Sequence, residues 1–272
     1  MPKLHRFTFH GTAVALSGRV IRPEEAWLDI AGASALPVEG GISRASIPAT
    51  TLAGVIGFQR AETYAQGELD EVPVLSGPRR RPPNDIHAHT GAEVRGLSVG
   101  GRIKMTAARV RAELTALCPL HTHQPSIGAM EGARFEGVAF GKHRLAIAID
   151  RQFFRNHDTH DKLCAACVDA GHHGPPRAVL RAPRPRNQAR DEYDGPLVAT
   201  IVKSMRWVDR PYPRASIEGH SVVIPGFGRV HFGEMLVSGP TRRLTMLRFA
   251  LDGDVVMDAA CCEVEAGGTW VR

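Results

Sequence analysis

The side chains with the most specific chemistry lie in one short stretch, residues 156–173, which holds several imidazoles and two thiols. If a helix runs from Asp158 or Thr159 to Gly171, residues three and four apart share one of its faces. Asp158 can cap the first turn, and Gly171 can take the left-handed conformation that closes a helix. The side chains placed on one stripe are His157, His160, Cys164 and Cys167.

This stripe is too long to surround a single ion. At about 1.5 Å of rise per residue it spans roughly 15 Å, whereas zinc binds its ligands at about 2.0–2.3 Å. We therefore expect the C-x-x-C pair to be the centre of a zinc site, with further ligands that fold back onto it. Mixed thiolate and imidazole ligands suit zinc. The candidate ligands are Cys164, Cys167, His160, His172 and His173.

The same stretch also fits an interpretation without metal. Free cysteine is among the most buried residue types. Cys164, Cys167 and Leu163 can therefore form the buried face of a short surface helix while the histidines stay in water. A thioredoxin-like redox pair belongs in a βαβ setting, which the chain does not display. The sequence leaves the choice between zinc and a buried thiol face open.

Two further histidine pairs are candidates for chemistry. His87 and His89 project from the same face of an extended segment, which fits a metal or proton-transfer site but is more typical of the solvent-exposed face of a half-buried strand. His121 and His123 follow Cys118 in an expected loop. They could supply ligands to the C-x-x-C pair, or they could belong to a polar surface loop.

Residues 96–100 match the G-x-S-x-G pattern of a nucleophile elbow. That motif needs a strand that turns sharply into a helix, with an acid and a histidine later in the chain, and His220 or His231 could follow. However, residues 103–117 alternate as a strand does, although their apolar positions also fit a helical stripe. We therefore expect a strand and not a helix after Ser98, and no P-loop, dinucleotide fingerprint or H-E-x-x-H is present. A non-catalytic protein is favoured over an enzyme.

The composition predicts a chain built from strands. Its 272 residues include 28 glycines and 19 prolines, and 6% are aromatic, which favours many short strands and turns. We expect a mainly β fold, an antiparallel β-sandwich or barrel-like assembly with one short α-helical insertion. Strands are predicted at residues 7–20, 45–69, 86–90, 109–116, 133–140, 144–150, 197–202, 221–224, 229–237, 244–251 and 255–264.

The domain organisation follows from this pattern. One β-rich domain is expected over residues 1–272, with a helical Cys/His and Arg/Pro-rich insertion at 151–195. Residues 22–28 predict the start of a short helix, because proline suits a first turn. Adjacent Cys261 and Cys262 should face opposite sides of their strand, so that one is in the core and neither pairs with the other.

The ends and the charge of the chain indicate its compartment and partners. The start leads into alternating residues, which predicts no signal peptide, and no apolar run of about 18 residues predicts a membrane span. Five cysteines do not look like a secreted disulfide framework, so cytoplasmic residence is expected. The net charge is +6, and the Arg/Pro-rich loops at 77–84 and 175–195 could contact an acidic partner.

These observations favour a soluble, non-catalytic binding or self-assembly protein, homo-oligomeric because partner subunits can cover strand edges. It would carry a structural zinc site in the Cys/His stretch. The first alternative is a zinc-dependent hydrolase that uses Cys164, Cys167 and a histidine, with an open coordination position. The second is a basic nucleic-acid-binding protein, which the scarcity of aromatic residues disfavours.

Overall fold

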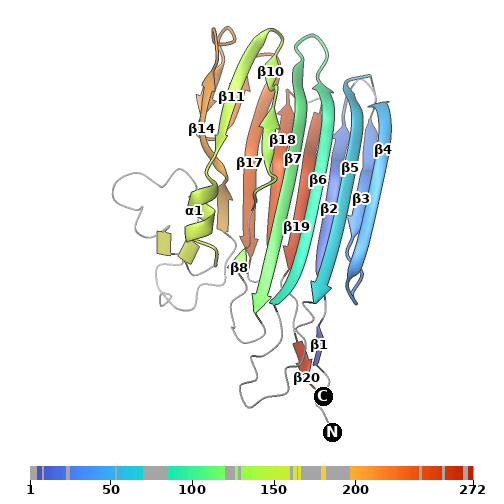
Figure 1. Ribbon diagram of the computed structural model, residues 1–272. Helices are drawn as coiled ribbons and strands as arrows, with labels where there is room; N and C mark the ends of the chain where they lie inside the picture. Colours follow the sequence, from blue (N-terminus) through green and yellow to red (C-terminus); the bar gives the residue numbers. More distant parts are fainter. Residues whose placement is uncertain are drawn as a thin grey trace.

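The protein is a sandwich of two large antiparallel sheets that lie face to face (Figure 1). Each sheet is open, with different strands at its two ends, so that the sandwich and not the barrel is the fold. The computed structural model describes residues 5–7, 9–22, 25–52, 54–69, 85–119, 126–127, 130–159, 162–163, 165–166, 179–181, 197–238, 241–252, 255–265 and 269–271.

The first sheet contains the longest strands of the described chain. Its order is β14 (Val202–Trp207), β11 (His143–Ile149), β10 (Ala139–Phe140), β7 (Met105–Pro119), β6 (Asp85–Val99), β5 (Ile56–Leu69) and β4 (Gly41–Leu52). Two short strands, β8 (Ser126–Ile127) and β9 (Arg134–Glu136), also pair with β7.

The second sheet contains the C-terminal meander and the strands nearest the N-terminus. Its order is β12 (Val179–Arg181), β13 (Leu197–Thr200), β17 (Gly228–Ser238), β18 (Thr241–Leu251), β19 (Val255–Glu265), β2 (His10–Val20) and β3 (Ala26–Ala35). β16 (Ser221–Ile224) pairs with β17 and with β15 (Ser216–Glu218). A separate two-stranded sheet is formed by β1 (His5–Phe7) and β20 (Thr269–Val271).

The core lies between the sheets and draws side chains from both of them. Along β5, buried and half-buried residues alternate, because successive side chains point to opposite faces of a strand. Ala61, Thr63 and Ala65 form the buried row of β5, and the hydroxyl of Thr63 lies 2.8 Å from that of Ser34 on β3. The residues between them, such as Tyr64 and Gln66, point to the outer face of the first sheet.

Most predicted strands are confirmed, including the extended conformation of residues 105–117 within β7. The helix predicted to start within 22–28 is wrong, because residues 26–28 open β3. Trp27 pairs with Arg19 there, and Leu28 pairs with Gly18. Ladder hydrogen bonds to β2 thus override the proline signal.

The helix predicted from residue 158 or 159 to Gly171 is described only at residues 162–163 and 165–166, which are helical, and a separate helix precedes it. α1 covers Arg151–Asn156 and is capped by Asp150, whose Oδ1 accepts a hydrogen bond from the backbone of Phe153 at 3.1 Å. A second helical turn follows at residues 162–163, where Thr159 Oγ1 accepts from the backbone N–H of Lys162 at 3.3 Å. Thr159 thus caps this turn, within the range in which the sequence predicts a helix start.

A row of irregular residues crosses the second sheet. It runs through Gly233, Met246, Ala260, Ala15 and Gly32, which fall between the registered pairs of five neighbouring strands. On alternate strands the backbone takes positive φ, with 60° at Gly233, 53° at Ala260 and 67° at Gly32. A left-handed residue resets which face the following side chains occupy. The alternation of buried and outward-facing residues therefore shifts by one position across the row; on β17 it is Val230 and Phe232 before Gly233, but Met235 and Val237 after it, that are buried.

The adjacent cysteines face opposite sides of β19, as the sequence predicts, and of the two only Cys262 belongs to the core cluster between the sheets. Cys261 and Cys262 are 5% and 1% exposed, and both are free thiols. Cys261 Sγ lies 3.6 Å from the hydroxyl of Thr245, itself buried, so polar neighbours cover this thiol on its own side of the strand. Burial raises the pKa of Cys261 to about 11, helped by the charge of Asp258.

Candidate functional site

The zinc ligands predicted from the sequence are not located by the structure. His160, Cys164, Cys167, His172 and His173 all lie outside the described residues, as do His121 and His123. Of their neighbours, Leu163 is buried and Lys162 forms an ion pair with Asp158 at 2.6 Å. The Cys/His zinc site therefore stays a prediction.

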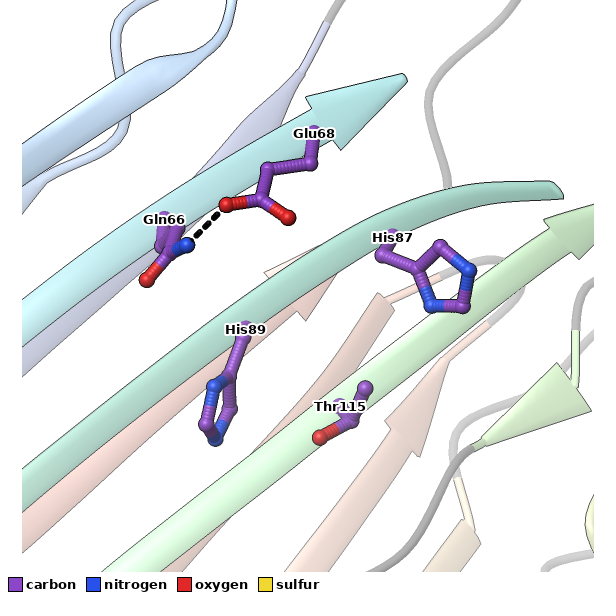
Figure 2. A pocket seen from close by; sticks show the side chains of 5 residues that line it. All are labelled: Gln66, Glu68, His87, His89 and Thr115. Carbon is purple, nitrogen blue, oxygen red and sulfur yellow. Dashed lines mark hydrogen bonds between the residues drawn. The ribbon is translucent and has the colours of Figure 1, made fainter. Parts of the chain in front are cut away.

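The other predicted pair, His87 and His89, does share one face of a strand. Both side chains line a pocket of about 270 Å³ on the outer face of the first sheet, near the ends of β5 and β7 (Figure 2). The sheet register explains this: His87 pairs with Glu68, and His89 pairs with both Gln66 and Thr115. The residues that line the pocket are Gln66, Glu68, His87, His89 and Thr115.

Tyr64 fixes the orientation of His89. Its hydroxyl lies 2.9 Å from His89 Nε2, and the two rings meet edge to face with centroids 4.9 Å apart. Tyr64 pairs across the strands with Gly91, where a Cβ would lie 2.5 Å from the tyrosine ring. Only glycine at position 91 leaves space for the ring in this position.

Glu113 supports the same imidazole from the neighbouring strand. Its Oε1 lies 3.6 Å from His89 Nε2 and accepts a hydrogen bond from the backbone of Gly132 at 3.2 Å. Its Oε2 accepts from Arg111 Nη2 at 2.5 Å. Burial alone would raise the pKa of Glu113, but the hydrogen bonds of His89 and Arg111 outweigh it and hold the pKa at about 2. Burial and this nearby negative charge raise the pKa of Tyr64 above its usual value.

A ladder of charges continues away from the pocket along the same face. Glu93 is 6% exposed and contacts Arg95, Arg109 at 2.8 Å and Arg111 at 3.5 Å. Burial pushes the pKa of Glu93 upward, but hydrogen bonds from Arg109 and Arg95 outweigh it and hold the pKa below its usual value. Arg111 thus bridges Glu93 and Glu113, so that the charges form one connected row that reaches the group beside His89.

The arrangement can bind a ligand through an oriented imidazole. The contacts of His89 with Tyr64 and Glu113 both use Nε2, which leaves Nδ1 available to a molecule in the pocket. A histidine whose one nitrogen is held by a polar partner presents the other in a fixed direction. The sequence found the histidine pair through its two-residue spacing, but Tyr64 and Glu113 carry no such signal.

A second polar cluster lies on the second sheet. Among the described residues, the imidazoles of His220 and His231 and the carboxylate of Glu234 form the group whose ligand atoms are close enough for one ion, all within 4.8 Å of one another. Sequence reasoning considered the two histidines only as partners of Ser98. That serine lies in β6, paired with Gly57 and Thr106, and thus not at a strand-to-helix turn.

Fold and site together define an antiparallel β-sandwich with a polar pocket on one outer face. The chain belongs to the family described as Domain of unknown function (DUF8256), whose family model matches residues 7–170 and 180–238. No curated protein and no solved structure matches the chain. Across the described residues, no helix has the length and apolar character needed to span a bilayer.

Proposed function

We propose that the protein is a non-catalytic binding module that takes up a small polar molecule in the pocket of the first sheet. The observation that carries this proposal is the lining, which consists of two imidazoles, an amide, a carboxylate and a hydroxyl on three paired strands. Sites on strands are more rigid than sites on loops. Five neighbouring polar groups can together make several hydrogen bonds to one ligand. Little conformational entropy is lost on binding, because the strands already hold these side chains close together.

The charge of the lining selects the class of ligand. Glu68 contributes a carboxylate, and none of the five lining side chains is a lysine or arginine. Among the described residues, Arg111 contacts the Tyr64 hydroxyl behind His89, and it is paired with Glu113. A neutral polyhydroxylated molecule or a small cation therefore fits the pocket better than a phosphate or carboxylate, which would meet like charge.

The groups behind the pocket favour binding over catalysis. A general acid or base works best with a pKa near the operating pH. The pKa of Tyr64 is raised and that of Glu113 is held at about 2, so neither group exchanges a proton readily near neutral pH. Both groups serve to hold His89 in place.

A ligand screen followed by nuclear magnetic resonance tests the proposal. Tag-free protein is titrated with monosaccharides, polyols and small amines, and with phosphate and acetate as comparators. We expect saturable shifts of the His87 and His89 ring resonances with a neutral or cationic probe, lost in His89→Ala. The control is His143→Ala, because His143 lies on β11 and hydrogen-bonds the backbone of Arg210 at 3.0 Å. Shifts that survive His89→Ala, or that appear only with anions, would contradict the proposal.

Self-assembly is a second candidate function, favoured by β4, which among the described strands pairs with β5 alone. This strand ends the first sheet, is twelve residues long, and keeps Ile42 48% exposed. Unpaired backbone groups along an edge can pair with a second copy of the chain. Light scattering should then give a homo-oligomer that Ile42→Lys weakens. A monomer at every concentration would exclude this assembly.

A further inference from the structure

A local break in strand alternation brings His231 and Glu234 to the same face of β17. Residues three apart on a regular strand point to opposite faces. Between them, Gly233 takes a φ of 60°, and a Cβ there would lie 2.6 Å from Ile201 Cγ1. His220 joins them from the turn before β16, where its carbonyl accepts a hydrogen bond from the backbone of Phe232 at 2.9 Å.

The two distances from Glu234 to the histidines are close to those between ligands of one metal ion. Glu234 Oε1 lies 3.1 Å from His220 Nε2 and 3.6 Å from His231 Nδ1. Zinc binds imidazole nitrogen and carboxylate oxygen at about 2.0–2.2 Å, which in a tetrahedral arrangement separates neighbouring ligand atoms by about 3.3–3.6 Å. The two imidazole rings, with centroids 5.3 Å apart, are tilted by 37°. The ligand atoms of all three residues lie within 4.8 Å of one another, so small side-chain rotations would bring the two histidine nitrogens to the same separation.

A second layer of contacts fixes the carboxylate. Arg248 Nη1 binds Glu234 Oε2 at 2.6 Å, and Arg248 Nε binds Asp258 Oδ1 at 2.9 Å. Oε2 is thus occupied and Oε1 is turned toward the histidines. Partners that orient ligating side chains in this way are typical of metal centres.

The cluster is shielded but accessible. The side chains of His220, Glu234 and His231 keep 12%, 13% and 24% of their surface exposed. Ser221, which is 2% exposed, places its hydroxyl 2.8 Å from His231 Nδ1, the nitrogen that would bind an ion. An entering ion would displace this hydrogen bond, and solvent could complete its coordination.

We propose that His220, His231 and Glu234 form a binding site for Zn²⁺, with a fourth position open to water. Two imidazoles and one carboxylate are a ligand set of catalytic zinc centres, which keep an open position, whereas structural sites are closed by four protein ligands. This site is separate from the Cys/His stretch and from the pocket of the first sheet. It gives the chain a metal centre whether or not the pocket binds a ligand.

Zinc titration of tag-free, chelator-stripped protein tests the proposal. Affinity is measured by competition with a chromophoric chelator for the wild type, for Cys164→Ala/Cys167→Ala, and for His220→Ala/His231→Ala. We expect the cysteine variant to keep one site that the histidine variant lacks or binds at least about 100-fold more weakly. The matched control is His143→Ala, which should bind as the wild type does.

Cobalt absorption provides a second measurement that does not depend on folding of the histidine variant. Co²⁺ in the cysteine variant should give visible ligand-field bands without a thiolate charge-transfer band, and Glu234→Gln, a conservative change, should weaken its binding. A cysteine variant that binds neither Zn²⁺ nor Co²⁺ would overturn the proposal. Unchanged zinc affinity when His220→Ala/His231→Ala is added to the cysteine variant, with the protein still folded, would also overturn it.

Discussion

Replacing Glu113 with glutamine tests the network that holds His89. Glutamine keeps the size of the side chain and part of its hydrogen bonding, but it removes the charge that Arg111 and the backbone of Gly132 stabilise. We expect Glu113→Gln to destabilise the fold at neutral pH. The loss should fade in acid, because protonation of the wild-type carboxyl removes the same charge.

The size of the effect follows from the pKa of Glu113, which falls from its usual value of 4.5 to about 2 in the folded protein. One pKa unit corresponds to about 1.4 kcal/mol, so without any solvent screening the whole shift would contribute about 3 kcal/mol to the free energy of unfolding. The side chain keeps 13% of its surface exposed, and solvent screening reduces the expected loss to about 1–3 kcal/mol. Since the folded pKa is depressed, this stability is fully present above about pH 4.5 and is lost as the pH falls toward about 2.

Urea unfolding of the wild type and the variant at pH 7, 5, 4 and 3 measures this difference. The matched control is Glu136→Gln on β9, because Glu136 is 48% exposed and meets Arg134 at 3.7 Å. A surface ion pair of this kind contributes about 0–1 kcal/mol. A destabilisation by Glu113→Gln that does not exceed the control at pH 7, or that is equal at pH 7 and pH 3, would refute the reasoning.

Three further substitutions have definite expected outcomes. Gly91→Ala should cost about 1–3 kcal/mol in thermal or urea unfolding because its Cβ meets the Tyr64 ring, and the cost should shrink in a Tyr64→Ala background. Ala260→Gly should cost at least about 1 kcal/mol less than Ala259→Gly in urea unfolding, since only Ala260 has positive φ; equal costs would contradict this. Ser221→Ala should tighten zinc binding about 5-fold in chelator competition by removing a competing hydrogen bond of about 1 kcal/mol, and weaker binding would count against it.

The fold was largely predictable from local patterns. Two-residue alternation identified most strands, and it also placed His87 and His89 on one face, where both line the pocket. The helix start predicted within 22–28 failed because pairing with β2 outweighs a local preference for helix. Function in self-assembly, a Cys/His zinc site and contact with an acidic partner or nucleic acid remain predictions.

The sequence by itself determined which residues form strands and which side chains alternate across them, because both depend on near neighbours in the chain. Only the tertiary structure decided which strands pair, and thereby placed Tyr64 and Glu113 beside His89. It also decided that Gly233 breaks the alternation, so that His231 and Glu234 share a face. Register and left-handed residues depend on contacts between distant segments, which no short pattern in the chain encodes.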